Sequence, residues 1–187
     1  NAENDYLKSV LKDTEQDQKI LFEEMKGRIK EDDASVPYFK NGYWYYSRYE
    51  EGKEYPIHCR KKDSLDNDEI ILWDENVEAK NHPYYDVVSF SVSKDNKIMA
   101  FAEDITGRRL YQIRFKNLET GHLYPNLLSN CSSDLAWHND NNRIYFVQKD
   151  PETLRPHQVS CHELFNNSSK LVFEEEDDTF ICGVSKS

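Results

Sequence analysis

An internal repeat with a period of about 45 residues limits the fold of this chain more than any other feature. Residues 89–96 (SFSVSKDN) resemble residues 134–141 (DLAWHNDN), at an offset of 45 residues. The strand-like runs that follow, residues 97–104 and 143–150, both end in Asp and are offset by 46 residues, so one residue is inserted at the turn. Units of this length with four short antiparallel strands are typical of β-propeller blades.

The repeat predicts two further strands in each unit and extends in both directions along the chain. The predicted third and fourth strands are residues 110–115 and 123–127 in one unit, and 157–162 and 170–173 in the next. Phe180 aligns with Leu135, so residues 180–187 are predicted to be the first strand of another unit.

An earlier copy of the first hairpin lies at residues 38–49. Two aromatic runs, residues 36–39 and 43–49, flank Asn41-Gly42, and both turn residues accept the positive φ of a tight hairpin. Residues 55–59 and 70–73 are expected to be the other two strands of this unit.

The sequence therefore predicts a mainly β fold. We expect a partial β-propeller of about three four-stranded blades plus the first strand of a fourth, preceded by short N-terminal helices. The predicted bounds are residues 1–35 for a helical arm and 36–187 for the propeller, with blades at roughly 36–80, 86–130 and 132–176 and the next beginning at 179–187. An open ring leaves its faces uncovered, so we expect the chain to be part of a longer protein.

The arm is predicted from helical spacing, with helices at roughly 5–12 and 15–30. Thr14, followed by Asp17, is a weak capping signal for the second helix. Apolar side chains line one stripe of each helix, namely Tyr6, Leu7, Val10 and Leu11, then Leu21, Met25 and Ile29. Nothing else in the chain is predicted to be helical, so these stripes need a partner outside it.

Charge and cysteine content narrow the class of protein. The net charge of −11 argues against binding to nucleic acid or to an anionic membrane surface. No CxxC pair occurs, so the sequence contains no zinc or redox motif of that kind. Sparse cysteines without a pattern are expected for a cytoplasmic protein. They are Cys59, Cys131, Cys161 and Cys182. The polar N-terminus lacks the features of a secretory leader, and no apolar run is long enough to span a bilayer.

Three features carry a functional alternative beside a structural one. His157 and His162, beside Cys161, could suggest a metal site, but five-residue spacing in a strand places them on opposite faces, so no metal site is predicted. The acidic runs at residues 31–33 and 174–178 could attract basic peptides, although solvated loops are the favoured interpretation. The aromatic cluster at residues 43–46 could line a peptide tunnel, although filling the space between blades is favoured.

Several stretches resemble the prolyl oligopeptidase family of serine peptidases. Residues 93–96 (SKDN) and 109–121 (RLYQIRFKNLETG) are similar to a turn and a third strand of the propellers of that family. Residues 24–37, 42–57 and 98–104 resemble its oligopeptidase B (protease II) branch. The resemblance is spread over nearly the whole chain and includes the leading helices.

The resemblance implies a propeller of roughly seven blades that covers an α/β-hydrolase domain. It also implies that the N-terminal arm packs on the hydrolase side. Family members cleave short peptides after Lys or Arg with a Ser-Asp-His triad in the hydrolase domain, while the propeller acts as a size filter and gate. The implied partners are thus the chain's own C-terminal hydrolase domain and short basic peptides.

The catalytic elbow G-x-S-x-G does not occur, because no two glycines are four residues apart. We therefore predict no catalytic, cofactor-binding or metal-binding residue in this chain and no amidase activity for the chain alone, which we expect to self-associate through exposed blade edges. The alternatives are a stand-alone propeller scaffold for protein partners and a small carbohydrate- or peptide-binding β-sandwich. The incomplete further unit argues against the scaffold, and the repeat argues against the sandwich.

Overall fold

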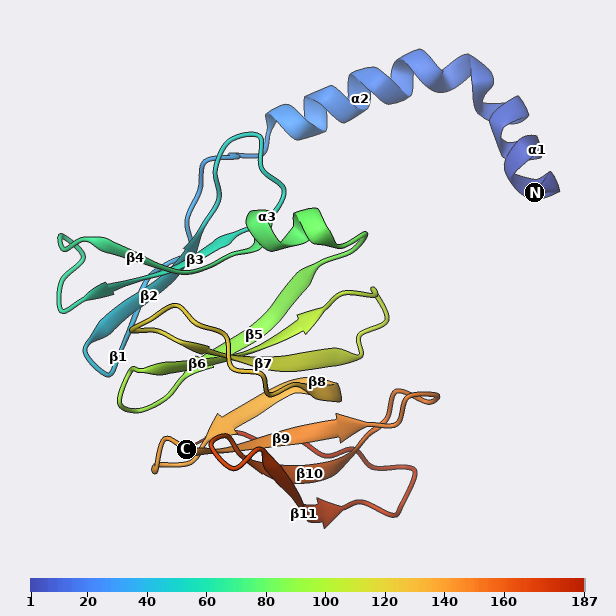
Figure 1. Cartoon of the computed structure of the whole chain (residues 1–187). Helices are drawn as coiled ribbons and strands as arrows, with labels where there is room; N and C mark the ends of the chain where they lie inside the picture. Colours follow the sequence, from blue (N-terminus) through green and yellow to red (C-terminus); the bar gives the residue numbers. More distant parts are fainter. Residues whose placement is uncertain (187) are drawn as a thin grey trace.

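A computed structural model describes residues 1–186, and its N-terminal part is the predicted helical arm. Helix α1 spans Ala2–Leu11, the 3-10 turn η1 spans Lys12–Thr14, and α2 spans Glu15–Gly27. None of their residues is buried, and Figure 1 shows the arm projecting away from the sheets. Thr14 precedes α2 as predicted, but its hydroxyl donates to the Leu11 carbonyl oxygen instead of capping the helix.

The first sheet contains four antiparallel strands in the order of the sequence. They are β1 Tyr38–Lys40, β2 Tyr43–Arg48, β3 Ile57–Lys62 and β4 Glu69–Asp74. Asn41 and Gly42 have φ values of 49° and 84°, so the predicted Asn-Gly hairpin turn is confirmed. Helix α3 (Glu75–Glu78) and the 3-10 turn η2 (Ala79–Asn81) lead to the next sheet.

The second sheet contains seven antiparallel strands, also in sequence order. They are β5 Asp86–Val92, β6 Ile98–Asp104, β7 Tyr111–Asn117, β8 Leu128–Trp137, β9 Arg143–Lys149, β10 Pro156–Glu163 and β11 Ser168–Glu174. Asn96 and Asn141, which are equivalent in the repeat, both adopt positive φ, at 63° and 60°. The repeated turns of the sequence are therefore repeated turns of the backbone.

The predicted fourth strand at residues 123–127 is wrong, because the observed strand β8 lies further along the chain. The strand begins at Leu128, where it pairs with Ile113 of β7, and Leu123 makes only an isolated bridge to Lys116. Pro125 explains the shift, since proline has no N–H to donate to a ladder. The strand then continues past a bulge to pair Leu135–Trp137 with β9, so one strand joins two groups of the sheet.

The predicted strand at residues 180–187 is also corrected. The structure assigns no strand to residues 180–186, and Ser187 lies outside the described residues. The segment forms no ladder with a neighbouring strand, and a strand is stable only when its backbone groups are paired. Its backbone contacts include a hydrogen bond from the Cys182 N–H to the Pro156 carbonyl oxygen.

Two hydrophobic clusters hold the sheets together, and the second of them connects one sheet to the other. The first cluster lies within the second sheet and is centred on Phe115, Trp137 and Phe146. The second contains Tyr45 and Trp73 from the first sheet and Phe101 from the second. The architecture is mainly β and is a partial propeller, while the predicted blade bounds stay predictions. In the described part of the chain, no helix has the length and apolarity needed to span a membrane.

Candidate functional site

A hollow of about 740 Å³ lies where β5 and the end of β8 run beside each other. These two strands are in contact, and the Trp137 indole N–H donates to the Ser91 carbonyl oxygen over 2.9 Å. The β1–β2 turn and residues 184–186 complete the wall. The first strand of each blade faces the central channel in propellers, so this hollow would lie on the channel side of a closed ring.

The wall carries ammonium groups although the chain as a whole is acidic. Lys40, Lys94 and Lys186 line the hollow, and Asp134 contributes a carboxylate. The Lys186 ammonium is held by the Trp137 carbonyl oxygen at 3.2 Å and by the Asn139 side-chain oxygen at 2.9 Å. The charged side chains of the hollow are therefore three ammonium groups and one carboxylate.

The aromatic side chains at residues 43–46 point to two sides of the first sheet. Tyr45 is 2% exposed, stacks on Tyr38 with ring centroids 5.5 Å apart, and belongs to the cluster that joins the sheets. The Tyr43 ring lies 4.0 Å from the Arg60 guanidinium. Trp44 and Tyr46 point to the other side, where the Tyr46 hydroxyl donates to Glu69 over 2.6 Å. Tyr45 thus fills the space between the sheets, as favoured from the sequence.

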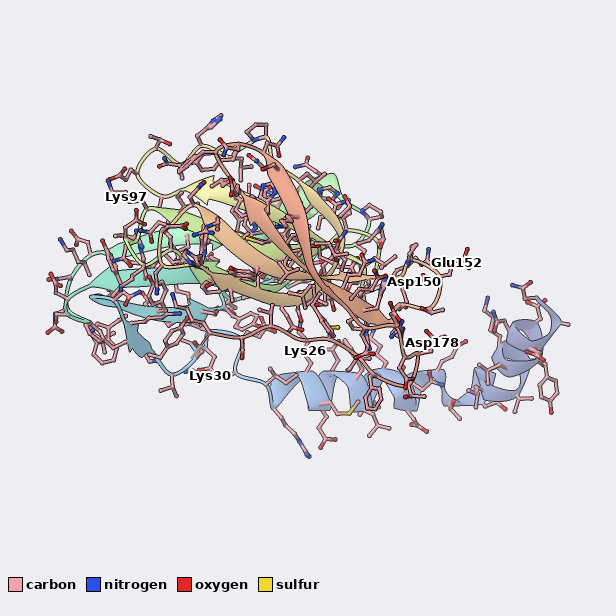
Figure 2. All side chains as sticks on the ribbon, turned by 90° about the horizontal axis from the view of Figure 1, so that it is seen from below. Lys26, Lys30, Lys97, Asp150, Glu152 and Asp178 are labelled. Carbon is pink, nitrogen blue, oxygen red and sulfur yellow. The ribbon has the colours of Figure 1, made fainter. Side chains whose placement is uncertain are left out.

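The acidic run at residues 31–33 is tied to the chain by local contacts. Glu31 accepts a hydrogen bond from the Gly52 N–H at 3.0 Å, which with Lys26 lowers the pKa of its carboxyl group. Asp33 is paired with Lys30 at 3.1 Å. Figure 2 shows Lys26 and Lys30 near the base of the arm.

The second acidic run, residues 174–178, surrounds Arg155. The Arg155 guanidinium pairs with Asp178 at 3.1 Å and donates to the backbone carbonyl oxygens of Glu175 and Asp177. Figure 2 shows Asp178 at the same end of the molecule as Asp150 and Glu152, with Lys97 at the opposite end. Attraction of basic peptides by this end stays a prediction.

Among the histidines and cysteines singled out in the sequence, His162, Cys59 and Cys131 are buried. His162 is 1% exposed, bonds through Nδ1 to the Ser169 hydroxyl at 2.9 Å, and has a pKa lowered by burial. Burial raises the pKa of the Cys59 and Cys131 thiols to about 12. Within residues 1–186, no group of three or more His, Cys, Asp and Glu side chains is arranged to hold a metal ion.

A buried polar network between the sheets was missed in the sequence. Tyr85 donates to Glu103 at 2.8 Å and accepts from the Trp73 indole N–H at 2.9 Å. Arg114 donates to the other oxygen of Glu103 at 3.2 Å. The available signal was the uninterrupted apolar run at residues 98–102 directly before Glu103, in a strand that is buried at every position. A strand covered on both faces needs a partner for any acid that it contains.

The arm presents the apolar stripes that the sequence predicted, and they are exposed in this chain. Leu7 and Val10 of α1 are 54% and 56% exposed, and Leu21 and Met25 of α2 are 55% and 59% exposed. An apolar stripe of this size normally faces another element.

Comparison with known proteins gives the same family for the whole chain. The domain family described as "Prolyl oligopeptidase, N-terminal beta-propeller domain" matches residues 1–187. The chain is 41% identical to dipeptidyl aminopeptidase BI of Pseudoxanthomonas mexicana and 30% identical to protease 2 of Moraxella lacunata, over 100% and 99% of its length. It spans 28% of the length of each of these two relatives.

A solved structure agrees with the sequence comparison. Oligopeptidase B from Leishmania major superposes with a TM-score of 0.87 and 28% sequence identity, over 94% of this chain and 25% of that one. The repeat, the helical arm and the two sheets described above all lie within residues 1–187, which the domain family matches. The chain therefore belongs to the family of N-terminal β-propeller domains of prolyl oligopeptidases.

Proposed function

We propose that this chain is the non-catalytic N-terminal propeller part of a serine peptidase that hydrolyses short peptides. The family match over residues 1–187 carries the proposal, together with two peptidase relatives of which the chain covers 28%. The catalytic triad in this proposal belongs to a C-terminal α/β-hydrolase domain. The exposed stripes of α1 and α2 would pack against that domain.

The role proposed for the propeller is a size filter and gate. The hollow beside β5 and β8 supports this role, since its wall would face peptides that pass along the ring. The filter is tested with a series of substrates of increasing length and one common cleavage site. A steep loss of kcat/KM beyond a limiting length supports the filter, and a flat profile contradicts it.

Cleavage after Lys or Arg is the specificity that we propose first. The resemblance of residues 42–57 to the oligopeptidase B branch supports it, as do the protease 2 relative and the oligopeptidase B structure. The acidic end of the molecule, which includes Asp150, Glu152 and Asp178, would favour the approach of basic peptides.

Release of dipeptides from peptide N-termini is the second candidate. The relative named dipeptidyl aminopeptidase BI supports it, because its identity of 41% exceeds the 30% of protease 2 over a similar span. Such an activity requires a free α-amino group near the scissile bond, whereas cleavage after an internal Lys or Arg does not.

Two chromogenic substrates distinguish these specificities in the full-length protein. One is an N-terminally blocked peptide ending in Arg, and the other is an unblocked dipeptide attached to the same leaving group. Hydrolysis of the blocked substrate supports cleavage after basic residues, and hydrolysis of only the unblocked one supports dipeptide release. The chain alone should hydrolyse neither. If the full-length protein is also inactive on both, a propeller scaffold for protein partners is the better account.

We also propose a cytoplasmic location. The support is chemical, since all four cysteines are free, as is usual in a reducing compartment. Fractionation of cells that express the full-length protein tests this, and recovery in the periplasm would contradict it.

A further inference from the structure

Ser47, His58 and Glu75 form a hydrogen-bonded chain that none of the functions above uses. The Ser47 hydroxyl lies 3.0 Å from Nδ1 of His58, and Nε2 of the same ring lies 2.6 Å from Oε1 of Glu75. Ser47 and His58 are directly opposite each other on β2 and β3, and Glu75 begins α3. The arrangement comes from three elements that are close in sequence and rigidly paired.

The hydrogen bonds of Glu75 fix the direction of this chain. Glu75 is 1% exposed, and its second oxygen, Oε2, accepts from the Val87 N–H at 3.1 Å. A carboxylate that accepts at both oxygens draws the imidazole hydrogen to Nε2. Nδ1 is then left with its lone pair toward the Ser47 hydroxyl, which is the order of nucleophile, base and orienting acid in serine hydrolases.

A hollow of about 260 Å³ gives access to the serine. Ser47 and His58 line it, together with Tyr38 and Phe90. Phe90 packs edge-on against the His58 ring with centroids 4.9 Å apart and so restricts its rotation. Ser47 is half-buried and lines this hollow. The volume and the aromatic lining suit a short acyl chain on a small ester.

We propose that Ser47 is an activated nucleophile that accepts acyl groups from short-chain esters. The Ser47 oxygen forms a bond to the ester carbonyl carbon while its proton passes to Nδ1 of His58. The carbon–oxygen bond to the leaving alcohol then breaks, and the alcohol takes the bonding electrons and that proton. Water later hydrolyses acyl-Ser47 by the same route, returning the hydroxyl and releasing the carboxylic acid.

Covalent labelling of the full-length protein with a small dialkyl fluorophosphate tests this proposal. The serine oxygen replaces fluoride on phosphorus, and the proton leaves through His58. Trypsin releases Ser47 in the peptide of residues 41–48, which contains no other serine, so mass spectrometry separates this label from that on any other reactive serine. We expect time-dependent phosphorylation of Ser47 in the folded protein and none in protein unfolded in urea.

Three variants complete the test. Ser47→Ala should abolish the label on this peptide, and Glu75→Gln should slow labelling roughly 100-fold or more, because the imidazole loses its orienting carboxylate. Ser64→Ala is the matched control: Ser64 lies in the turn between β3 and β4, outside this hollow, and its hydroxyl donates to Asp66 over 3.4 Å. Labelling of Ser47 in that variant should be unchanged. An unlabelled Ser47 in the folded wild-type protein, or equal rates in the wild type and Glu75→Gln, would overturn the proposal.

Discussion

Asp104 and Asp150 occupy equivalent positions in the repeat, yet their carboxylates have different surroundings. Asp104 is 1% exposed and accepts through one oxygen from the N–H groups of Thr106 and Gly107, and through the other from the Arg109 N–H at 2.8 Å. Asp150 accepts from the N–H groups of Glu152 and Thr153 through Oδ1 and is less buried. Burial raises the pKa of Asp104, but its backbone donors outweigh this effect and lower the pKa overall, and backbone donors also lower the pKa of Asp150.

We predict that Asp104→Asn destabilises the chain more than Asp150→Asn does. The side-chain amide introduced by Asp104→Asn would turn a donor toward the Arg109 N–H, at a cost of about 1–3 kcal/mol in the free energy of unfolding at neutral pH. Urea unfolding followed by tryptophan fluorescence measures both losses.

The pH dependence of the Asp104→Asn effect checks its electrostatic origin. Because the folded-state pKa of Asp104 lies below its unfolded value, the carboxylate contributes stability above pH ~4, and this contribution is lost as the pH falls through the folded-state pKa. The difference between wild type and Asp104→Asn should therefore shrink on acidification. If the difference in unfolding free energy between wild type and Asp104→Asn stays constant from pH ~6 to pH ~3, this account is contradicted. Equal losses of unfolding free energy in Asp104→Asn and Asp150→Asn would also contradict it.

The residues that sequence predicted best are those whose role is local. Asn41-Gly42 and the repeated Asn96 and Asn141 are turn residues, and turn conformation depends on the chain itself. Glu75 and Glu103 were not predicted to be buried, because the groups that satisfy them come from other strands or from the second sheet. A short-range pattern contains no information about such partners.

Among the elements, strand type was predictable and strand ends were not. The repeat located β5 to β7 and β9 to β11 along the chain. The repeat alone could not reveal that β8 starts after Pro125 and continues into the next group of strands. Pairing decides where a strand begins, and Pro125 is the residue that a closer examination of the sequence could have used.

The proposed docking of the arm on the rest of the full-length protein can be tested at helix α2. Leu21→Asp with Met25→Asp should destabilise the docking of the arm in the full-length protein by roughly 3–6 kcal/mol, because each apolar side chain contributes about 1.5–3 kcal/mol when buried. The unfolding of the chain alone should not change, since both side chains are exposed there. Limited proteolysis of the arm and thermal melting of both proteins measure this.

Lys19→Asp is the control for the arm. Lys19 is also exposed on α2, but it lies two positions before Leu21 and so on the opposite side of the helix. It should leave the full-length protein unaffected. Equal sensitivity of the full-length protein to Lys19→Asp would mean that general helix stability, not docking, is being measured.

At the scale of the molecule, we predict that the chain alone self-associates. Strand β11 is the last strand of its sheet, and Leu171, Val172 and Phe173 are 47%, 54% and 51% exposed. An uncovered edge with apolar side chains recruits another copy. Light scattering should show a mass above that of the monomer, and a monodisperse monomer would count against the prediction.

A pair of substitutions locates the self-association. Leu171→Lys with Phe173→Lys, which lie on one face of β11, should shift the mass toward the monomer. His122→Lys, in an exposed turn between β7 and β8, adds a positive charge away from that edge and should have no effect. If the two variants have the same mass by light scattering, the arm is the associating surface instead.

The overall architecture was predictable because repetition is visible in sequence, whereas the hollow beside β5 and β8 was not. Its wall combines residues from the β1–β2 turn, two strands and residues 184–186. These segments meet only through the curvature of the whole assembly. The lysines of the wall, Lys40, Lys94 and Lys186, have no common motif that would have grouped them.

The continuity of β8 has a mechanical consequence. A rotation between the strand groups on either side of β8 would have to bend a single hydrogen-bonded strand. The first sheet is joined to the second by the helical link at residues 75–85, by side-chain packing and by buried hydrogen bonds of Tyr85 and Glu75, without a shared strand. Under tension, this segment of the ring should therefore yield first between β4 and β5, which makes that junction the natural hinge of the described structure.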